Sequence, residues 1–138
     1  ERVLEVGTGS GYQAAVLYLL VPHGHLITME RVAALQEKAK ALLAELGYHN
    51  VTAELAGPTL GAPQRGPFDA IIVTAASPRI PDSLVSQLAI GGRLVIPVGT
   101  RENQELMRVL RTDEGISVRW LGHCRFVPLI GKEAFPEQ

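Results

Sequence analysis

A glycine-rich segment near the start of the chain constrains the fold more than any other feature. The apolar run Val3 to Val6 is followed directly by Gly7-Thr8-Gly9-Ser10-Gly11, and residues 12–20 are then apolar all round. Glycines let the backbone turn tightly and approach a ligand, and the first N–H groups of a helix have no partner within it. This order predicts a strand, a turn open to a ligand and a buried helix. A tight connection without a ligand is the alternative interpretation.

The rest of the chain repeats the alternation of strand and helix. Apolar runs predict strands at 25–29, 51–55, 68–74 and 93–97, and helical spacing predicts helices at 32–46 and 81–89, the second ended by Gly91-Gly92. Beyond Gly99, residues 106–112 and 116–121 predict a β-hairpin, and a last strand is expected near 125–129. We therefore predict an α/β fold with a doubly wound, Rossmann-like sheet, mostly parallel with an antiparallel edge hairpin.

Length and composition exclude several classes of function. A chain of 138 residues favours one domain, and 13 Lys and Arg against 14 Asp and Glu give no basic footprint for nucleic acid. The longest apolar stretch is too short to span a bilayer, so we expect no membrane role. The single Cys124 cannot form an internal disulfide, which fits the cytoplasm, and we expect it in a half-buried strand. The four His residues are scattered, so no metal is expected.

The spacing of acidic residues narrows the class of cofactor. Glu30 ends the second predicted strand, where a carboxylate can accept both hydroxyls of a ribose; the alternative is an ordinary acid in the first turn of a helix. A dinucleotide-binding fingerprint needs its third glycine one position later than Gly11, which disfavours NAD. With Glu5 two residues before Gly7, the segment resembles the first motif of S-adenosylmethionine-dependent methyltransferases.

Four blocks together resemble the protein-L-isoaspartate O-methyltransferases. They are residues 3–13, 68–76 with two following prolines, 91–99 and 125–131, and they span almost the whole chain in order. The resemblance implies a Rossmann-like methyltransferase domain over residues 1–138. It also implies methyl transfer from S-adenosylmethionine to the α-carboxylate of L-isoaspartyl residues, which begins the repair of damaged proteins.

The resemblance also implies roles for individual residues. The cofactor-binding set is Glu5, Gly7, Thr8, Gly9, Ser10, Gly11, Glu30, Arg31, Pro58 and Thr59, with Glu30 on the ribose and Arg31 beside the adenine. The substrate-binding set is Thr74, Ala75, Ala76, Val127, Pro128 and Leu129. From the residues alone, 74–76 equally fit close packing and 127–129 a terminal core strand. Isoaspartyl peptides and proteins are the expected partners, and we expect a monomer.

The sequence departs from the family pattern in two places. Gly57-Pro58-Thr59 stands where the family has Gly-Asp-Gly, whose Asp accepts from the adenine amine; Pro58 has neither an acceptor side chain nor an N–H. The chain also opens directly in a predicted core strand, so we expect it to lack the N-terminal segment that carries the family's active-site Ser. No catalytic residue is assigned for this reason. An S-adenosylmethionine-binding module without turnover, and a small-molecule methyltransferase of the same fold, remain alternatives.

Overall fold

The computed structural model describes residues 1–21 and 23–137, and it contains one sheet of seven strands in the order β3-β2-β1-β4-β5-β6-β7. Strands β1 to β5 run parallel, whereas β6 is antiparallel to both of its neighbours. The strands are β1 (Arg2–Val6), β2 (His25–Glu30), β3 (Val51–Leu55), β4 (Phe68–Val73), β5 (Leu88–Gly99), β6 (Gln104–Thr112) and β7 (Gly115–Cys124). The helices are α1 (Tyr12–Leu20), α2 (Ala33–Glu45), α3 (Asp82–Ser86) and a 3-10 turn at Pro63–Arg65. The predicted parallel sheet with an antiparallel edge hairpin is confirmed.

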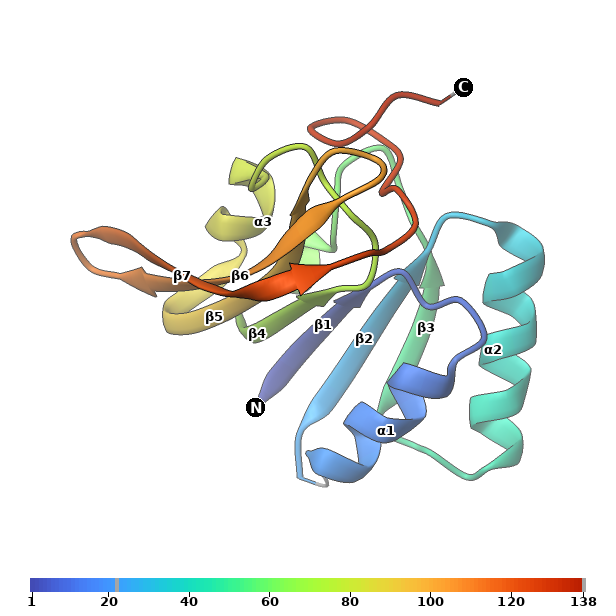
Figure 1. The fold of residues 1–138 in the computed structure, drawn as a ribbon. Helices are drawn as coiled ribbons and strands as arrows, with labels where there is room; N and C mark the ends of the chain where they lie inside the picture. Colours follow the sequence, from blue (N-terminus) through green and yellow to red (C-terminus); the bar gives the residue numbers. More distant parts are fainter. Residues whose placement is uncertain (22, 138) are drawn as a thin grey trace.

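The two faces of the sheet bury different apolar clusters, because side chains alternate along each strand. On one face α1 and α2 cover β1, β2 and β3, and Figure 1 shows both helices on the same side of these strands. The other face carries the larger cluster, closed by α3 and by the loops after β3 and β7. The hairpin formed by β6 and β7 extends away from α1 and α2 (Figure 1). Among the described residues, no helix is long and apolar enough to cross a membrane.

The predicted helix at 81–89 is too long. Helix α3 ends at Ser86, and the chain enters β5 at Leu88, which pairs with Phe68 and is buried. Gly91-Gly92 therefore lies inside β5, at an irregularity in its pairing with β4, and does not end a helix. A Cβ at Gly92 would lie 2.9 Å from the Phe68 carbonyl oxygen, so glycine allows close approach of the two strands.

The predicted strand at 125–129 is also wrong. Strand β7 extends to Cys124, which is half-buried as expected, and the following segment forms only isolated bridges, one of them between Ala76 and Pro128. Pro128 has no N–H to donate to a strand ladder, which limits the pairing to a single bridge.

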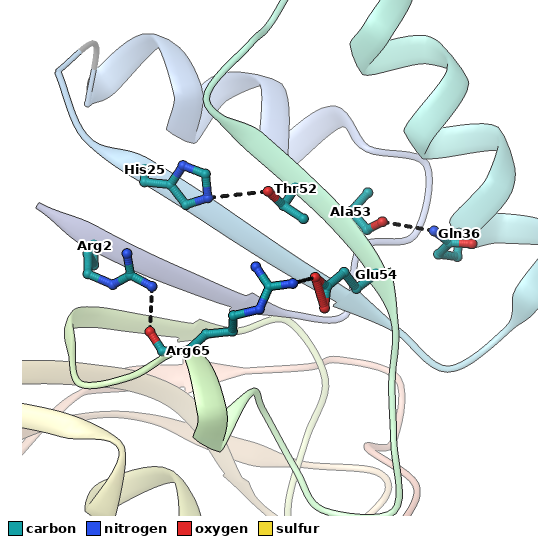
Figure 2. Close-up of polar contacts among 7 residues, drawn as sticks. All are labelled: Arg2, His25, Gln36, Thr52, Ala53, Glu54 and Arg65. Carbon is teal, nitrogen blue, oxygen red and sulfur yellow. Dashed lines mark hydrogen bonds and ion pairs between the residues drawn. The ribbon is translucent and has the colours of Figure 1, made fainter.

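Polar contacts fix α2, β3 and the 3-10 turn at one side of the sheet (Figure 2). Gln36 donates through Nε2 to the Ala53 carbonyl oxygen at 2.8 Å, which ties α2 to β3. Arg65 forms an ion pair with Glu54 of β3, and Arg2 donates to the carbonyl oxygen of the same Arg65. These bonds lie among side chains that the candidate site does not use, and they hold its scaffold together.

Candidate functional site

A pocket of about 520 Å³ lies at the carboxyl ends of β1, β2 and β4. Open parallel sheets bind ligands at this edge, and the volume is within the usual range for a small-molecule site. Three segments enclose the pocket: the glycine turn with the end of β2, the loop at 56–61, and residues 127–131. The predicted cofactor and substrate segments therefore open on the same cavity.

Two glycines shape the turn in different ways. Gly7 has φ +104°, and a Cβ there would lie 2.6 Å from the Thr74 hydroxyl oxygen. Gly9 has φ +55° and lines the pocket, and a Cβ there would meet no atom within 4 Å. The first position needs glycine for packing and backbone conformation, whereas the second leaves free volume that a ligand can fill.

The Glu30 carboxylate accepts backbone hydrogen bonds from the glycine turn and from the start of α2. Its Oε1 accepts from the Gly9 N–H at 2.9 Å, and its Oε2 accepts from the Val32 N–H at 2.8 Å, one residue before α2. The side chain is 7% exposed and lines the pocket. It therefore supports the glycine turn and the start of α2, and each of its oxygens retains a further lone pair for a ligand.

A buried chain of side-chain hydrogen bonds lies beneath the turn. Thr28 donates to Glu5 Oε1 at 2.6 Å, and the Thr28 and Thr8 hydroxyl oxygens are 2.6 Å apart. Glu5 is fully buried, and its Oε2 has no hydrogen-bond partner. Burial and, to a smaller degree, the Glu30 carboxylate raise the pKa of Glu5 to about 7, against the lowering effect of the Thr28 bond.

The loop after β3 forms the wall opposite the glycine turn. Pro58 and Thr59 are exposed and line the pocket. Arg31 also lines it, and its Nη2 lies 2.6 Å from Glu137 Oε1 in an ion pair. At the predicted adenine end the wall therefore offers a proline, a hydroxyl and a paired guanidinium.

The third wall is held mainly by main-chain bonds. The Ala76 N–H donates to the Val127 carbonyl oxygen, and the Leu129 N–H donates to the Ala76 carbonyl oxygen, each at 2.7 Å. Thr74 and Ala75 line the pocket beside them, and the Thr74 hydroxyl donates to the Gly7 carbonyl oxygen at 2.7 Å. Val127 is exposed, Pro128 half-buried and Leu129 buried, and all three line the pocket.

Five predicted site residues do not line the pocket. Glu5 and Thr8 belong to the buried chain beneath the turn, and Ala76 is fully buried behind the third wall. Ser10 accepts from the Tyr12 N–H at 3.3 Å, and Gly11 is the N-cap of α1. These residues support the residues that line the pocket, and their contacts with a ligand remain predictions.

Sequence reasoning missed two kinds of residue. Apolar and backbone positions that line the pocket were not singled out, namely Val6, Met29, Val32, Leu35, Ala56, Gly57, Leu60, Gly61, Ile130 and Gly131. Thr28 was also missed, although a polar residue inside the apolar run of β2 is a visible signal of a buried hydrogen bond. Among the described residues, no group of three or more His, Cys, Asp or Glu side chains could hold a metal ion.

Comparison with known proteins gives consistent matches. The family profile described as Protein-L-isoaspartate(D-aspartate) O-methyltransferase matches residues 1–134. The protein-L-isoaspartate O-methyltransferase of Syntrophotalea carbinolica is 50% identical over 139 residues, which cover 100% of this chain and 63% of that protein. The enzyme of the same name from Shewanella baltica is 53% identical over 133 residues, covering 96% of this chain and 62% of that protein. The chain thus spans less than two thirds of the length of these relatives.

Solved structures agree with the sequence matches. A protein-L-isoaspartate O-methyltransferase superposes with a TM-score of 0.89 at 29% identity, over 96% of this chain and 43% of that one. A Plasmodium falciparum protein, described as a putative member of the same family in complex with S-adenosyl-L-homocysteine, gives a TM-score of 0.75 at 26% identity. That superposition covers 91% of this chain and 64% of the Plasmodium chain.

Proposed function

This chain belongs to the protein-L-isoaspartate(D-aspartate) O-methyltransferase family, and we propose that it transfers a methyl group from S-adenosylmethionine to the α-carboxylate of L-isoaspartyl residues. The observation that carries this proposal is the shared pocket: Gly9 and Glu30 line it together with Val127 and Leu129. A cofactor and a peptide bound to these two walls would meet in one cavity, as direct transfer between them requires.

The residues present fit the cofactor. Free volume beside Gly9 accommodates a ligand, and the Glu30 carboxylate is a strong acceptor for ribose hydroxyls. We propose that Gly7 and Gly9 bind the cofactor directly, that Arg31, Pro58 and Thr59 contact its adenine end, and that the other four predicted residues support them. The supporting residues are Glu5, Thr8, Ser10 and Gly11.

When bound, the cofactor supplies an electrophilic methyl group on a positively charged sulfur. The substrate carboxylate is already ionised near neutral pH, so the chain needs no strong general base. Its own contribution is to orient the two reactants and exclude water. The main-chain bonds of Thr74 and Ala76 and the bond from the Thr74 hydroxyl to Gly7, next to the glycine turn, suit that task.

Residues 127–129 would bind the peptide through their main chain. The Val127 carbonyl oxygen and the Leu129 N–H are both bonded to Ala76. Successive residues of an extended chain direct their main-chain groups to opposite sides, so the Pro128 carbonyl oxygen points away from Ala76. Since proline has no N–H, this edge offers a peptide one acceptor and no donor at that position.

We further propose that residues 1–138 form a single methyltransferase domain that acts as a cytoplasmic monomer, without nucleic-acid or membrane partners. The near-zero net charge and the single cysteine support this. Sedimentation velocity tests the monomer directly, and a mass near twice 14.9 kDa would contradict it.

Two measurements on the same preparation test the function. Calorimetry with S-adenosylhomocysteine tests the cofactor, and transfer of a labelled methyl group to an isoaspartyl peptide tests the reaction, with the matched aspartyl peptide as control. Saturable binding together with transfer to the isoaspartyl peptide alone would support the proposed function. Binding without transfer to either peptide would favour the binding-module hypothesis, and transfer only to small carboxylic acids would favour a small-molecule methyltransferase.

A further inference from the structure

The buried carboxyl of Glu5 is a titratable group that no step above uses. It is fully buried, with one oxygen bonded to Thr28 and the other without a partner among the described residues. An unsatisfied buried oxygen costs stability, so its retention calls for an explanation beyond packing.

Glu5 is connected to the pocket through the glycine turn. Thr28 donates to Glu5 and lies 2.6 Å from the Thr8 hydroxyl, and Thr8 stands between the two pocket-lining residues Gly7 and Gly9. When Glu5 is ionised it only accepts, so Thr28 must donate to Glu5 and Thr8 must donate to Thr28. The charge of Glu5 therefore sets the direction of both bonds beneath the turn.

The surroundings of Glu5 contain no compensating positive charge among the described residues. Strand β2 contributes Thr28 and the Glu30 carboxylate, and β4 contributes Ile72, which pairs with Glu5 in register. The buried residues on the two helices that cover this face are Ala14, Ala39 and Leu43, none of them titratable. Among the described pocket-lining residues, Arg31 is the one cationic side chain, and it is paired with Glu137.

We infer that Glu5 is a specificity-determining residue whose ionisation makes the site prefer the positively charged S-adenosylmethionine over S-adenosylhomocysteine, which lacks the charge on sulfur. The inference rests on the proposed function, because both ligands belong to it. Two carboxylates, Glu5 and Glu30, with no facing cation create a negative potential at the glycine turn, and a low-dielectric interior screens it weakly. That potential strengthens binding of the charged reactant and leaves binding of the neutral product largely unchanged.

The preference for S-adenosylmethionine over S-adenosylhomocysteine should increase as the pH rises. Burial raises the pKa of Glu5 to about 7, so the free protein gains this negative charge as the pH rises through neutrality. A bound cation lowers that pKa by favouring the ionised form, and by linkage binding of the cation releases a proton near pH 7. The neutral product has no such effect.

The first test needs no variant. Calorimetric titrations at about pH 6 and about pH 8 give the ratio of the dissociation constant of S-adenosylhomocysteine to that of S-adenosylmethionine. We expect the ratio to be about 3- to 10-fold larger at the higher pH, since a tenfold change corresponds to one pKa unit. Titration of protein groups that affect both ligands equally changes both dissociation constants by the same factor, so it cancels in the ratio. Repeating the titrations near neutral pH in buffers of different ionisation enthalpy should detect proton release with S-adenosylmethionine alone.

Variants assign the effect to Glu5. Glu5→Gln should make the ratio independent of pH, whereas Glu45→Gln, at an exposed position of α2, should keep the wild-type dependence. Thr28→Val removes the bond that lowers the pKa of Glu5, so it should move the transition to higher pH, and Thr28→Ser should restore it.

The possible results distinguish a failure of the proposed function from a failure of the role inferred for Glu5. If the wild-type protein binds neither ligand, the proposed function fails and the inference with it. If it binds both ligands with the same ratio at both pH values and no difference in proton release, the inference is overturned while the function stands. The wild-type measurements decide this even if Glu5→Gln does not fold.

Discussion

Two walls of the pocket are built by different means. The turn wall, residues 7–11 with Glu30, is held by side chains that reach it from neighbouring strands: Thr74 bonds to Gly7, Thr28 to Thr8, and Glu30 to Gly9. The bridge wall, residues 126–131, is held by main-chain bonds to Ala76 and by the bond from the Phe126 N–H to Gln104 Oε1 at 2.7 Å.

This difference determines which parts of the site depend on residue identity. In the turn wall each of three consecutive residues has its own side-chain partner, so single substitutions there should alter both rigidity and binding. In the bridge wall most contacts are made by groups that every residue has, so changes at 127 and 129 should be tolerated better than a change at Gln104. Substitutions in the two walls should therefore differ in their effects on stability and binding.

The largest effect is expected at Gly7. Gly7→Ala should lower the free energy of unfolding by about 3 kcal/mol, because φ +104° is strained for an L side chain and the new Cβ would lie 2.6 Å from the Thr74 hydroxyl oxygen. Denaturant unfolding measures this. Gly9→Ala is the matched control: it should cost about 1 kcal/mol while weakening cofactor binding, since its Cβ would occupy the pocket. Equal stability of the two variants would contradict the contrast.

Glu30 should matter mainly for binding. Glu30→Ala removes an acceptor for the ribose and the support of the Gly9 N–H, so cofactor affinity should fall by roughly 1.5 to 3 kcal/mol. Calorimetry on Glu30→Ala and on Glu37→Ala, an exposed position of α2, provides the comparison. Unchanged affinity in Glu30→Ala would remove the ribose assignment, and tighter binding of NAD than of S-adenosylmethionine would overturn the cofactor class.

Stability of the turn wall should depend on pH through Glu5. Because the pKa of Glu5 is raised from 4.5 to about 7 in the folded protein, the folded state binds the proton more tightly than the unfolded state between these values. Raising the pH through this window should therefore lower the free energy of unfolding by about 1 to 3 kcal/mol relative to Glu5→Gln. Unfolding curves for both proteins at each pH give the difference. A wild-type protein that gains stability over the same window relative to the variant would contradict the burial argument.

In the bridge wall, Gln104 should be the sensitive position. Gln104 is buried, accepts from the Phe126 N–H and donates to the Thr100 carbonyl oxygen at 2.8 Å. Gln104→Ala leaves these groups unpaired and should cost about 1 to 2 kcal/mol, with a raised KM for peptide and unchanged cofactor affinity. Gln64→Ala, on the exposed 3-10 turn, is the control. Loss of cofactor affinity in Gln104→Ala would show that the two walls are not independent.

Pocket-lining residues of both walls were predicted, Gly7, Gly9 and Glu30 by their spacing and residues 127–129 by the family resemblance, whereas Thr28 and Gln104, which hold the walls in place, were not. The glycines and Glu30 are recognisable because their spacing along the chain reflects a strand, a turn and the end of the next strand. Thr28 and Gln104 act through partners 23 and 22 residues away, Glu5 and Phe126. A polar residue in an apolar strand signals a buried hydrogen bond, but a local pattern does not identify so distant a partner.

The same distinction explains the errors in secondary structure. The strands of the parallel half are specified by their own apolar runs, and β3 was predicted at its observed bounds, Val51–Leu55. The segments near 88 and 125–129 depend on long-range pairing: Leu88 joins β5 because it pairs with Phe68, and Pro128 forms a single bridge, with Ala76, because proline has no N–H with which to extend a ladder. Propensity at these positions is overruled by tertiary contacts.

The smallest effect is expected at Pro58, which lines the pocket and whose own side chain cannot accept a hydrogen bond. Pro58→Asp should tighten binding of S-adenosylhomocysteine by about 0.5 to 1.5 kcal/mol, because the carboxylate can accept from the adenine amine. Pro63→Asp adds the same charge at an exposed position that does not line the pocket, so it should leave affinity unchanged. The gain should disappear with S-inosylhomocysteine, whose carbonyl replaces the amine as the group facing the new carboxylate. An equal gain in affinity for both nucleosides would mean that the introduced carboxylate acts through general electrostatics or loop conformation. No gain in affinity for either would mean that another group in the loop at 56–61 already accepts from the amine.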